Sequence, residues 1–167
     1  VTNAATSGDL NYSGVTVASV SGTVTDNDAA GVNVTPTTVN VTEGGATATF
    51  AVSLTSQPTS DVTITPTGDA DCSVSAALVF TSVNWMIAQD ITVTAVDDSL
   101  VEGTHSCTVT NAATSGDTNY DGIAASSVSG TVTDDGTAGV RVGPATDNGS
   151  GGGGTATLEE SLTSQPT

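Results

Sequence analysis

The sequence has almost no positive charge. Lysine is absent and Arg141 is the one arginine, against 18 aspartates and glutamates, so the net charge at pH 7 is −17. Binding of nucleic acid depends on clustered Lys and Arg side chains that contact phosphates, and docking on anionic lipid depends on the same charges. We therefore expect no nucleic-acid partner and no anionic membrane surface.

Aromatic residues and long apolar runs are also scarce. The chain contains one Trp, two Tyr and two Phe, and no apolar run approaches the roughly 20 residues of a membrane span, so we expect no membrane insertion in this segment. Threonine instead reaches 32 residues. Because β-branched side chains are disfavoured in helices and fit a pleated sheet, this composition favours a thin β-sandwich core.

Motifs of the common catalytic classes are missing. The sequence holds no Walker loop, GxSxG elbow, HExxH helix or CxxC pair. His105 lies two residues before Cys107, so both side chains would share one face of a strand, but no motif supplies a third group to orient such a pair. We interpret His105 as a surface imidazole and the protein as a non-enzyme.

A repeat with a period of 108 residues organises the chain. Residues 1–26 recur without a gap as residues 109–134, and residues 53–59 recur as 161–167. Of the 59 positions that can be compared, 39 are identical, which indicates tandem duplication.

This period divides the chain into three parts. Residues 1–31 are the C-terminal part of one repeat, residues 32–139 a complete repeat, and residues 140–167 the N-terminal part of the next. We interpret the chain as a window on a longer tandem array; the alternative is a recent duplication inside a short protein.

The third copy departs from the pattern. Val39, Val41 and Val52 of the complete repeat correspond to Asp147, Gly149 and Glu160. Residues 147–154 have no apolar side chain to bury and have the composition of a flexible, Gly-rich linker. This copy is either degenerate or, over residues 143–160, wrongly assigned.

Within the complete repeat, apolar residues alternate with polar ones, which is the pattern of half-buried strands. Turn-forming Gly, Pro, Asp, Asn and Ser lie between the alternating sets. About seven short strands and no helical periodicity predict an all-β fold, an immunoglobulin-like antiparallel β-sandwich. The alternating sets are Val32 and Val34; Val39 and Val41; Ala48, Phe50, Val52 and Leu54; Val62 and Ile64; Ile91, Val93 and Ala95; Val128, Gly130 and Val132.

An ordered set of motifs resembles the Calx-beta domain, a β-sandwich found in sodium–calcium exchangers and in large bacterial surface proteins. The motifs are Val41-Thr-Glu-Gly-Gly45, Phe80-Thr-Ser-Val-Asn-Trp85, Ile91-Thr-Val-Thr-Ala-Val-Asp-Asp98, Val101-Glu-Gly103 and Thr131-Val-Thr-Asp-Asp135. They span nearly the whole of residues 32–139. The resemblance implies a calcium-binding sandwich that occurs as tandem repeats in extracellular or surface proteins.

Acidic residues of the complete repeat are concentrated in the expected turns. Calcium takes 6–8 oxygen ligands, which turn carboxylates can supply from several segments. The resemblance places calcium where these acids converge: Glu43, Asp69, Asp71, Asp97, Asp98, Glu102, Asp134 and Asp135. The alternative is a set of solvated turn acids. Asp26 and Asp28, directly before the complete repeat, are candidates for a second metal that would stiffen the joint between repeats.

The chain has two cysteines, Cys72 and Cys107, separated by 35 residues. An even count in a Thr-rich, Lys-free chain favours a disulfide and an oxidising compartment over two free buried thiols.

Four Asn-x-Ser/Thr sequons, at Asn11, Asn33, Asn40 and Asn148, are candidate sites for glycan.

These features together predict a structural role. We expect a repeat segment of a secreted or cell-surface fibre, stiffened by the disulfide and by calcium. Its partners would be neighbouring copies of itself, because the exposed strand edges have no lysine to block strand addition. The alternative is an adhesin module that binds a host, cell-surface or matrix ligand.

Overall fold

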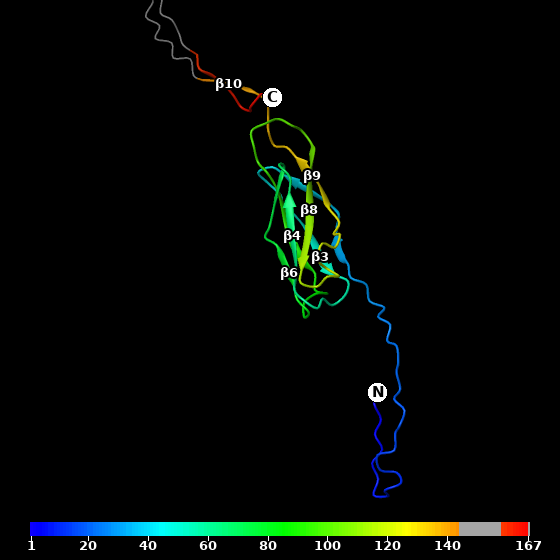
Figure 1. Cartoon of the computed structure of the whole chain (residues 1–167). Helices are drawn as coiled ribbons and strands as arrows, with labels where there is room; N and C mark the ends of the chain where they lie inside the picture. Colours follow the sequence, from blue (N-terminus) through cyan, green and yellow to red (C-terminus); the bar gives the residue numbers. More distant parts are fainter. Residues whose placement is uncertain (144–157, 167) are drawn as a thin grey trace, which may run out of the picture.

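The computed structural model describes residues 1–143 and 158–166, and in this part of the chain every regular element is a β-strand (Figure 1). Residues 32–133 form a sandwich of two sheets. The first sheet has the order β1 (Val32–Thr35), β3 (Ala48–Leu54), β7 (Gln89–Ala95) and β5 (Cys72–Val74). The second has the order β2 (Thr38–Thr42), β9 (Val128–Thr133), β8 (His105–Ser115), β4 (Val62–Gly68) and β6 (Leu78–Phe80).

The alternating sets point into the space between the sheets, and this confirms the predicted all-β sandwich. Buried members include Val41, Phe50, Ile64, Val93 and Val132. Trp85, in the connection between β6 and β7, is half-buried and packs against this core. Among the described residues no helix has the length and apolarity needed to cross a membrane.

The strand count and one pairing differ from the prediction. The complete repeat has nine strands where the alternation indicated about seven, because β5 and β6 have three residues each and are too short to alternate. The 11-residue strand β8 was also missed. Finally, β2 pairs with β9 in parallel, whereas all other paired strands of the two sheets are antiparallel.

A disulfide joins the two sheets. Cys72 on β5 and Cys107 on β8 are bonded, with their Cα atoms 5.9 Å apart, which confirms the predicted bridge. Gly130 on β9 lies opposite Cys107, and a Cβ at this position would lie 2.6 Å from the Cys107 Sγ. The glycine therefore leaves the space that the disulfide occupies within a set of inward-facing valines.

The turn that connects β8 to β9 is tied to the opposite sheet by Tyr120. We call residues 115–122 the Tyr120 turn. The buried Tyr120 hydroxyl accepts a hydrogen bond from the Ser56 N–H at 3.1 Å, donates to the Ser56 carbonyl at 2.6 Å and contacts the Ser56 hydroxyl at 2.8 Å. The Asp117 carboxylate accepts a hydrogen bond from the Thr59 N–H at 2.8 Å.

The two flanking segments lie outside the sandwich. Residues 1–31 contain no strand and leave one end of the sandwich as an extended, exposed chain (Figure 1). At the other end, β10 (Val140–Val142) and β11 (Glu160–Leu162) form an antiparallel hairpin. Residues 147–154, including Asn148, fall outside the described residues.

The β10–β11 hairpin copies the pairing of β1 with β3. Val140 faces Leu162 and Val142 faces Glu160, as Val32 faces Leu54 and Val34 faces Val52. These partners differ by the 108-residue period of the sequence. The hydrogen bond from the Thr163 N–H to the Gly139 carbonyl, at 2.9 Å, likewise copies the one from Thr55 to Gly31, at 3.0 Å.

Removing the disulfide should lower the free energy of unfolding. The bridge closes a loop of 35 residues, which corresponds to about 3–4 kcal/mol in the chain-entropy model. We expect the double variant Cys72→Ala/Cys107→Ala to lose this amount in urea unfolding. Reductant should destabilise the wild type by the same amount and leave the double variant unchanged; equal unfolding midpoints for the oxidised wild type and the variant would contradict the prediction.

Candidate metal centre at the acidic end of the sandwich

Seven strands begin or end at the same end of the sandwich, and the candidate calcium ligands lie there. Strands β2, β4, β7 and β9 end at this edge, while β3, β5 and β8 begin there. We call this region the acidic end. The turns that leave these strands bring together acids that are up to 92 residues apart, from Glu43 to Asp135.

Glu43 is the most deeply placed of these acids. It lies one residue past the end of β2 and continues the inward-facing positions of Val39 and Val41, and its N–H donates to the Thr133 carbonyl at 3.0 Å. Its side chain is 2% exposed, and the Oε2 atom has no hydrogen-bond partner among the described residues. A buried carboxylate oxygen without a partner is costly, so this position favours either a proton or a cation.

Two further carboxylates share the space around Glu43. Ligand atoms of Glu43, Asp134 and Asp135 all lie within 4.8 Å of one another. Gly44 has a φ of +58°, and a Cβ there would come within 3.0 Å of the Asp135 Oδ2 and 3.6 Å of the Asp97 Oδ2. The Gly44 turn therefore lets Asp97 and Asp135 approach the backbone next to Glu43.

Asp134 also anchors the loop that precedes β8. Its Oδ2 accepts hydrogen bonds from the N–H groups of Glu102, at 2.8 Å, and Gly103, at 2.7 Å, and its Oδ1 accepts one from Gly136 at 2.7 Å. The hydrogen bonds from Gly103 and Gly136 lower the pKa of Asp134 and keep it ionised. In the same loop, the Asp98 Oδ1 accepts a hydrogen bond from the Leu100 N–H at 2.7 Å.

His105 belongs to this cluster, which the sequence interpretation missed. Its Nε2 lies 3.5 Å from the Glu43 Oε1 and 4.0 Å from the Glu102 Oε2, and its Nδ1 lies 3.1 Å from the Gly103 carbonyl. The side chain is half-buried and is not a surface imidazole. Its place at the start of β8, on the same face as the buried Cys107, is the signal that could have located it.

Burial and neighbouring charge shift the pKa values of both groups. Burial raises the pKa of Glu43, and Asp134 raises it further, although His105 acts in the opposite direction. The hydrogen bond to the Gly103 carbonyl raises the pKa of His105, and Glu102, Glu43 and Asp71 add to this effect. Both groups therefore hold protons more tightly in the folded chain than in the unfolded chain.

Asp69 and Asp71 lie at the acidic end but outside the Glu43 cluster. The Asp69 Oδ2 accepts a hydrogen bond from the Thr108 N–H at 2.6 Å, and its Oδ1 accepts one from the Asp71 N–H at 3.2 Å. The cysteines nearest Asp69 form the disulfide and cannot bind a metal. Asp69 thus caps the β4–β8 ladder.

Asp26 and Asp28 lie at the opposite end of the sandwich. Both are exposed, and the Asp26 Oδ1 accepts a hydrogen bond from the Asp28 N–H at 3.0 Å. Neither belongs to a group of three potential metal ligands within the described residues.

Of the four candidate glycosylation sequons, those at Asn11, Asn33 and Asn40 have an exposed asparagine.

The arrangement offers the kind of oxygen donors that a hard cation requires. Glu43, Asp134 and Asp135 supply oxygen atoms within a small volume, and Asp97 and Glu102 lie beside them. The orphaned Glu43 Oε2 is the atom that a cation would satisfy. These donors fit calcium, which takes oxygen ligands in flexible geometry.

Comparisons with known proteins yield remote likenesses of fold. No family model and no curated protein matches the sequence. Solved structures similar to this chain include the periplasmic chaperone SfaE, at 15% identity and a TM-score of 0.48, covering 64% of this chain and 59% of that chain. Others are the apo form of the Calx CBD1 domain, at 15% identity and 0.45, covering 62% and 96%, and WR4, an MSP family member of C. elegans, at 12% and 0.37, also covering 62% and 96%. This chain thus spans less than two thirds of the chaperone's length.

Without divalent cations, stability should be highest in mildly acidic solution. Glu43 and His105 have raised pKa values in the folded chain, so their contributions to the free energy of unfolding fall as the pH rises from about 5 to 8. Asp117 and Asp134 have lowered pKa values, so their contributions are lost below about pH 4.

Urea unfolding in chelator between pH 3 and pH 8 measures this profile. We expect a maximum at about pH 5. Glu43→Gln should make the decline on the alkaline side shallower, whereas Asp28→Asn, which changes an exposed acid at the other end, should leave it unchanged. A stability that rises steadily from pH 5 to pH 8 in the wild type would contradict the assignment.

Proposed function

We propose that this chain is a structural repeat segment of a secreted or cell-surface fibre, in which Calx-beta-like units join end to end and calcium stiffens the joints. The observation that carries the proposal is the contact between the acidic end of the complete repeat and the start of the next copy. An array of loosely linked domains would not need such a contact.

The joint between the two copies is formed by backbone groups on both sides. The Gln165 N–H donates to the Ser99 carbonyl at 2.8 Å, and Gln165 forms a parallel bridge with Leu100. These two contacts hold the end of the β10–β11 hairpin against the loop that also carries Asp97 and Asp98.

The proposed calcium site lies next to this joint. Asp97, Asp98 and Asp135 line a common cleft with Thr163 and Ser164 of the following copy. Calcium bound by Glu43, Asp134 and Asp135, with Asp97 beside them, would neutralise mutual repulsion and order the loop from residue 96 to residue 104. The ordered loop would in turn fix the direction in which the next copy leaves.

The disulfide supports the compartment in this proposal. Bridges of this kind persist in oxidising surroundings and are rare in the cytosol, so the Cys72–Cys107 bond indicates a location outside the cytoplasm. The exposed Asn11, Asn33 and Asn40 sequons would then be open to glycan in an organism that attaches it.

A second candidate, an adhesin module, is favoured by one surface feature. Val83, Met86 and Ile87, in the connection between β6 and β7, are 85%, 64% and 59% exposed. These three exposed apolar residues lie within five positions of the chain, and exposed apolar patches commonly mark a site of protein contact. This surface would serve a ligand-binding role without affecting the joint.

Calcium should raise the thermal stability of the chain through Glu43. At a free concentration 100 times the dissociation constant, one site adds about 2.7 kcal/mol to the free energy of unfolding. Calorimetry should show this increase for the wild type and for Asp28→Asn. In Glu43→Gln, which keeps the shape and removes the buried charge, we expect little response to calcium and no loss of stability in chelator. An unchanged wild-type melting temperature on adding calcium would retire the metal part of the proposal.

Breaking the backbone contact at the joint should free the hairpin. Gln165→Pro removes the N–H that donates to Ser99, so the backbone amides of residues 158–166 should show lower NMR order parameters. In the wild type, calcium should raise these order parameters and chelator should lower them. Gln57→Pro, at the equivalent position of the complete repeat, serves as the matched control and should leave the joint ordered. Equal mobility of the hairpin in the wild type and in Gln165→Pro would contradict a built joint.

A further inference from the structure

A second set of possible metal ligands at the acidic end shares Glu43 with the proposed calcium site and includes a histidine. Ligand atoms of Glu43, Glu102 and His105 all lie within 4.8 Å of one another. His105 is the one histidine of the chain, and the two cysteines are bonded to each other, so no thiolate competes with its ring for a metal. This set combines an imidazole with carboxylates, whereas Glu43, Asp134 and Asp135 offer oxygen atoms alone.

Strand β9 lies between the strands that position Glu43 and His105. In the order β2-β9-β8, His105 pairs with Val132 on one side of β9, and the Glu43 N–H donates to the Thr133 carbonyl on the other, at 3.0 Å. His105 lies on the same face of β8 as the buried Cys107, and Glu43 continues the inward face of β2. The two side chains therefore meet over the end of β9, where the His105 Nε2 lies 3.5 Å from the Glu43 Oε1.

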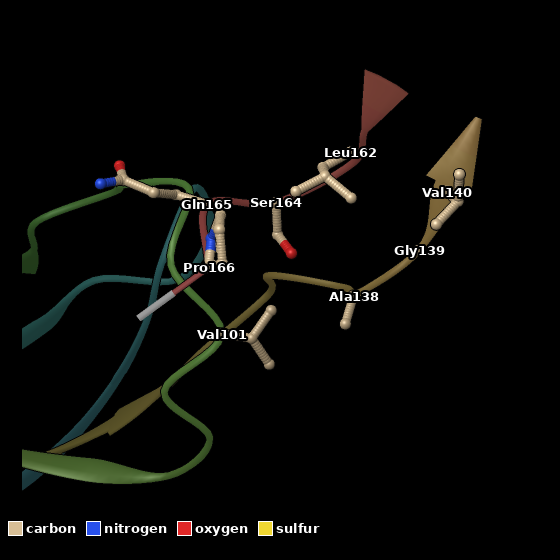
Figure 2. Close-up of a pocket in the computed structure, with 8 residues that line it drawn as sticks. All are labelled: Val101, Ala138, Gly139, Val140, Leu162, Ser164, Gln165 and Pro166. Atoms are coloured by element: carbon tan, nitrogen blue, oxygen red, sulfur yellow. The ribbon is translucent and has the colours of Figure 1, made fainter. Parts of the chain in front are cut away.

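The third ligand, Glu102, comes from a loop whose backbone is fixed by hydrogen bonds. The Asp134 Oδ2 accepts them from the N–H groups of Glu102 and Gly103, at 2.8 and 2.7 Å. The preceding residue, Val101, lines the groove shown in Figure 2 together with Gln165, so the loop also borders the joint to the next copy. The Glu102 carboxylate is thus held near His105 before any metal is bound.

The hydrogen bond of the His105 ring leaves the Nε2 atom for a metal. The Nδ1 atom lies 3.1 Å from the Gly103 carbonyl oxygen, which can only accept a hydrogen bond, so Nδ1 carries a hydrogen. In the neutral ring the lone pair is then on Nε2, the nitrogen that lies near both carboxylates. Metal-binding histidines commonly have this arrangement, in which the second ring nitrogen donates to a backbone carbonyl.

The spacing of the three groups resembles that of ligands around one small ion. A charge-assisted hydrogen bond between nitrogen and oxygen is about 2.7–2.9 Å long. The His105 Nε2 is farther than this from both carboxylates, at 3.5 Å from Glu43 and 4.0 Å from Glu102. Tetrahedral zinc, with bonds of about 2.0–2.1 Å, places neighbouring ligand atoms about 3.4 Å apart. Glu102 is 36% exposed, so its side chain has room for the small movement that remains.

The buried Glu43 carboxylate is independent evidence for a cation at this place. Its side chain is 2% exposed, and its Oε2 has no hydrogen-bond partner among the described residues. An imidazole beside such a carboxylate favours zinc or a similar transition ion, because calcium and magnesium take oxygen ligands.

We propose that Glu43, Glu102 and His105 form a zinc site, with water as the fourth ligand. His105 and Glu102 are 21% and 36% exposed, so water can reach the ion. Since Glu43 also belongs to the proposed calcium site, zinc and calcium exclude each other there. The zinc site goes beyond the proposed function and does not rest on it, because all three ligands belong to the complete repeat.

The single histidine allows a test on the wild-type chain by NMR. We expect zinc chloride, added to the full ¹⁵N-labelled chain without calcium, to shift the imidazole Nε2 resonance while Nδ1 keeps its hydrogen. Working at pH 8 limits competition from protons for Nε2. Magnesium chloride, the control cation, should leave the imidazole resonances in place. An imidazole spectrum that zinc in large excess does not change would overturn the inference.

Calorimetric titration with zinc chloride tests the ligands. In His105→Gln we expect a dissociation constant at least about 100-fold higher, because loss of a ligand costs more than the 10–100-fold loss caused by removing an outer-shell partner. Asp135→Asn, the matched control, removes a carboxylate from the proposed calcium site and should bind zinc as the wild type does. Equal zinc affinity of His105→Gln and the wild type, or an equal loss in both variants, would overturn the inference.

The two metal proposals can fail separately. The zinc titrations contain no calcium, so their failure would leave the proposed function standing. Conversely, a melting temperature that calcium does not change would leave the zinc site standing, because that site is measured through His105.

Discussion

The structure depends on one constraint: a strand with valines on one face is buried only where a second sheet lies across from it. The same sequence shows both outcomes. In the complete repeat Val109 and Val128 are fully buried, because β8 and β9 have strands beside them and the first sheet opposite. Their copies Val1 and Val20 are 88% and 63% exposed. The hydrogen bond from the Tyr12 N–H to the Asp9 carbonyl nevertheless matches the one from Tyr120 to Asp117. The geometry of the turn therefore follows from the local sequence, whereas burial of the valines requires both sheets.

The acidic end concentrates negative charge where seven strands begin or end, and backbone N–H groups bind several of its carboxylates. Asp134 alone accepts three such hydrogen bonds, of which those from Glu102 and Gly103 join the end of β9 to the loop before β8, and the third comes from Gly136 in its own turn. Glu43 is different, because its inward-facing position just past the end of β2 removes it from water without supplying a hydrogen-bond partner for Oε2. Asp134 thus connects two loops through hydrogen bonds, whereas the buried Glu43 carboxylate would be stabilised by a proton or a cation. The joint to the next copy lies beside both, which connects the electrostatics of one repeat to the position of its neighbour.

Much of the fold could be predicted from the sequence, because alternation over five or more residues is a non-random signal. Strands β3 and β7 and the inward positions of β9 were predicted in this way, and the two cysteines correctly indicated a bridge. Strands β5 and β6 were missed since three residues cannot display a period, and the parallel β2–β9 pair depends on long-range contacts that no local pattern contains. At the site, the acids of the turns were visible in the sequence, but the burial of Glu43 and the approach of His105 depend on the placement of β2 and β8 on either side of β9.

The parallel pairing of β2 with β9 has a mechanical consequence. The chain enters the sandwich at β1, at one end, and leaves from β9 at the other (Figure 1). Tension applied between the two ends of the sandwich would pull the start of β2 and the end of β9 in opposite directions. The β2–β9 ladder, from Thr38–Ser129 to Thr42–Thr133, would then be loaded in shear. Its backbone hydrogen bonds would have to break together, not one after another. A single pair of strands thereby sets the force that one repeat can withstand.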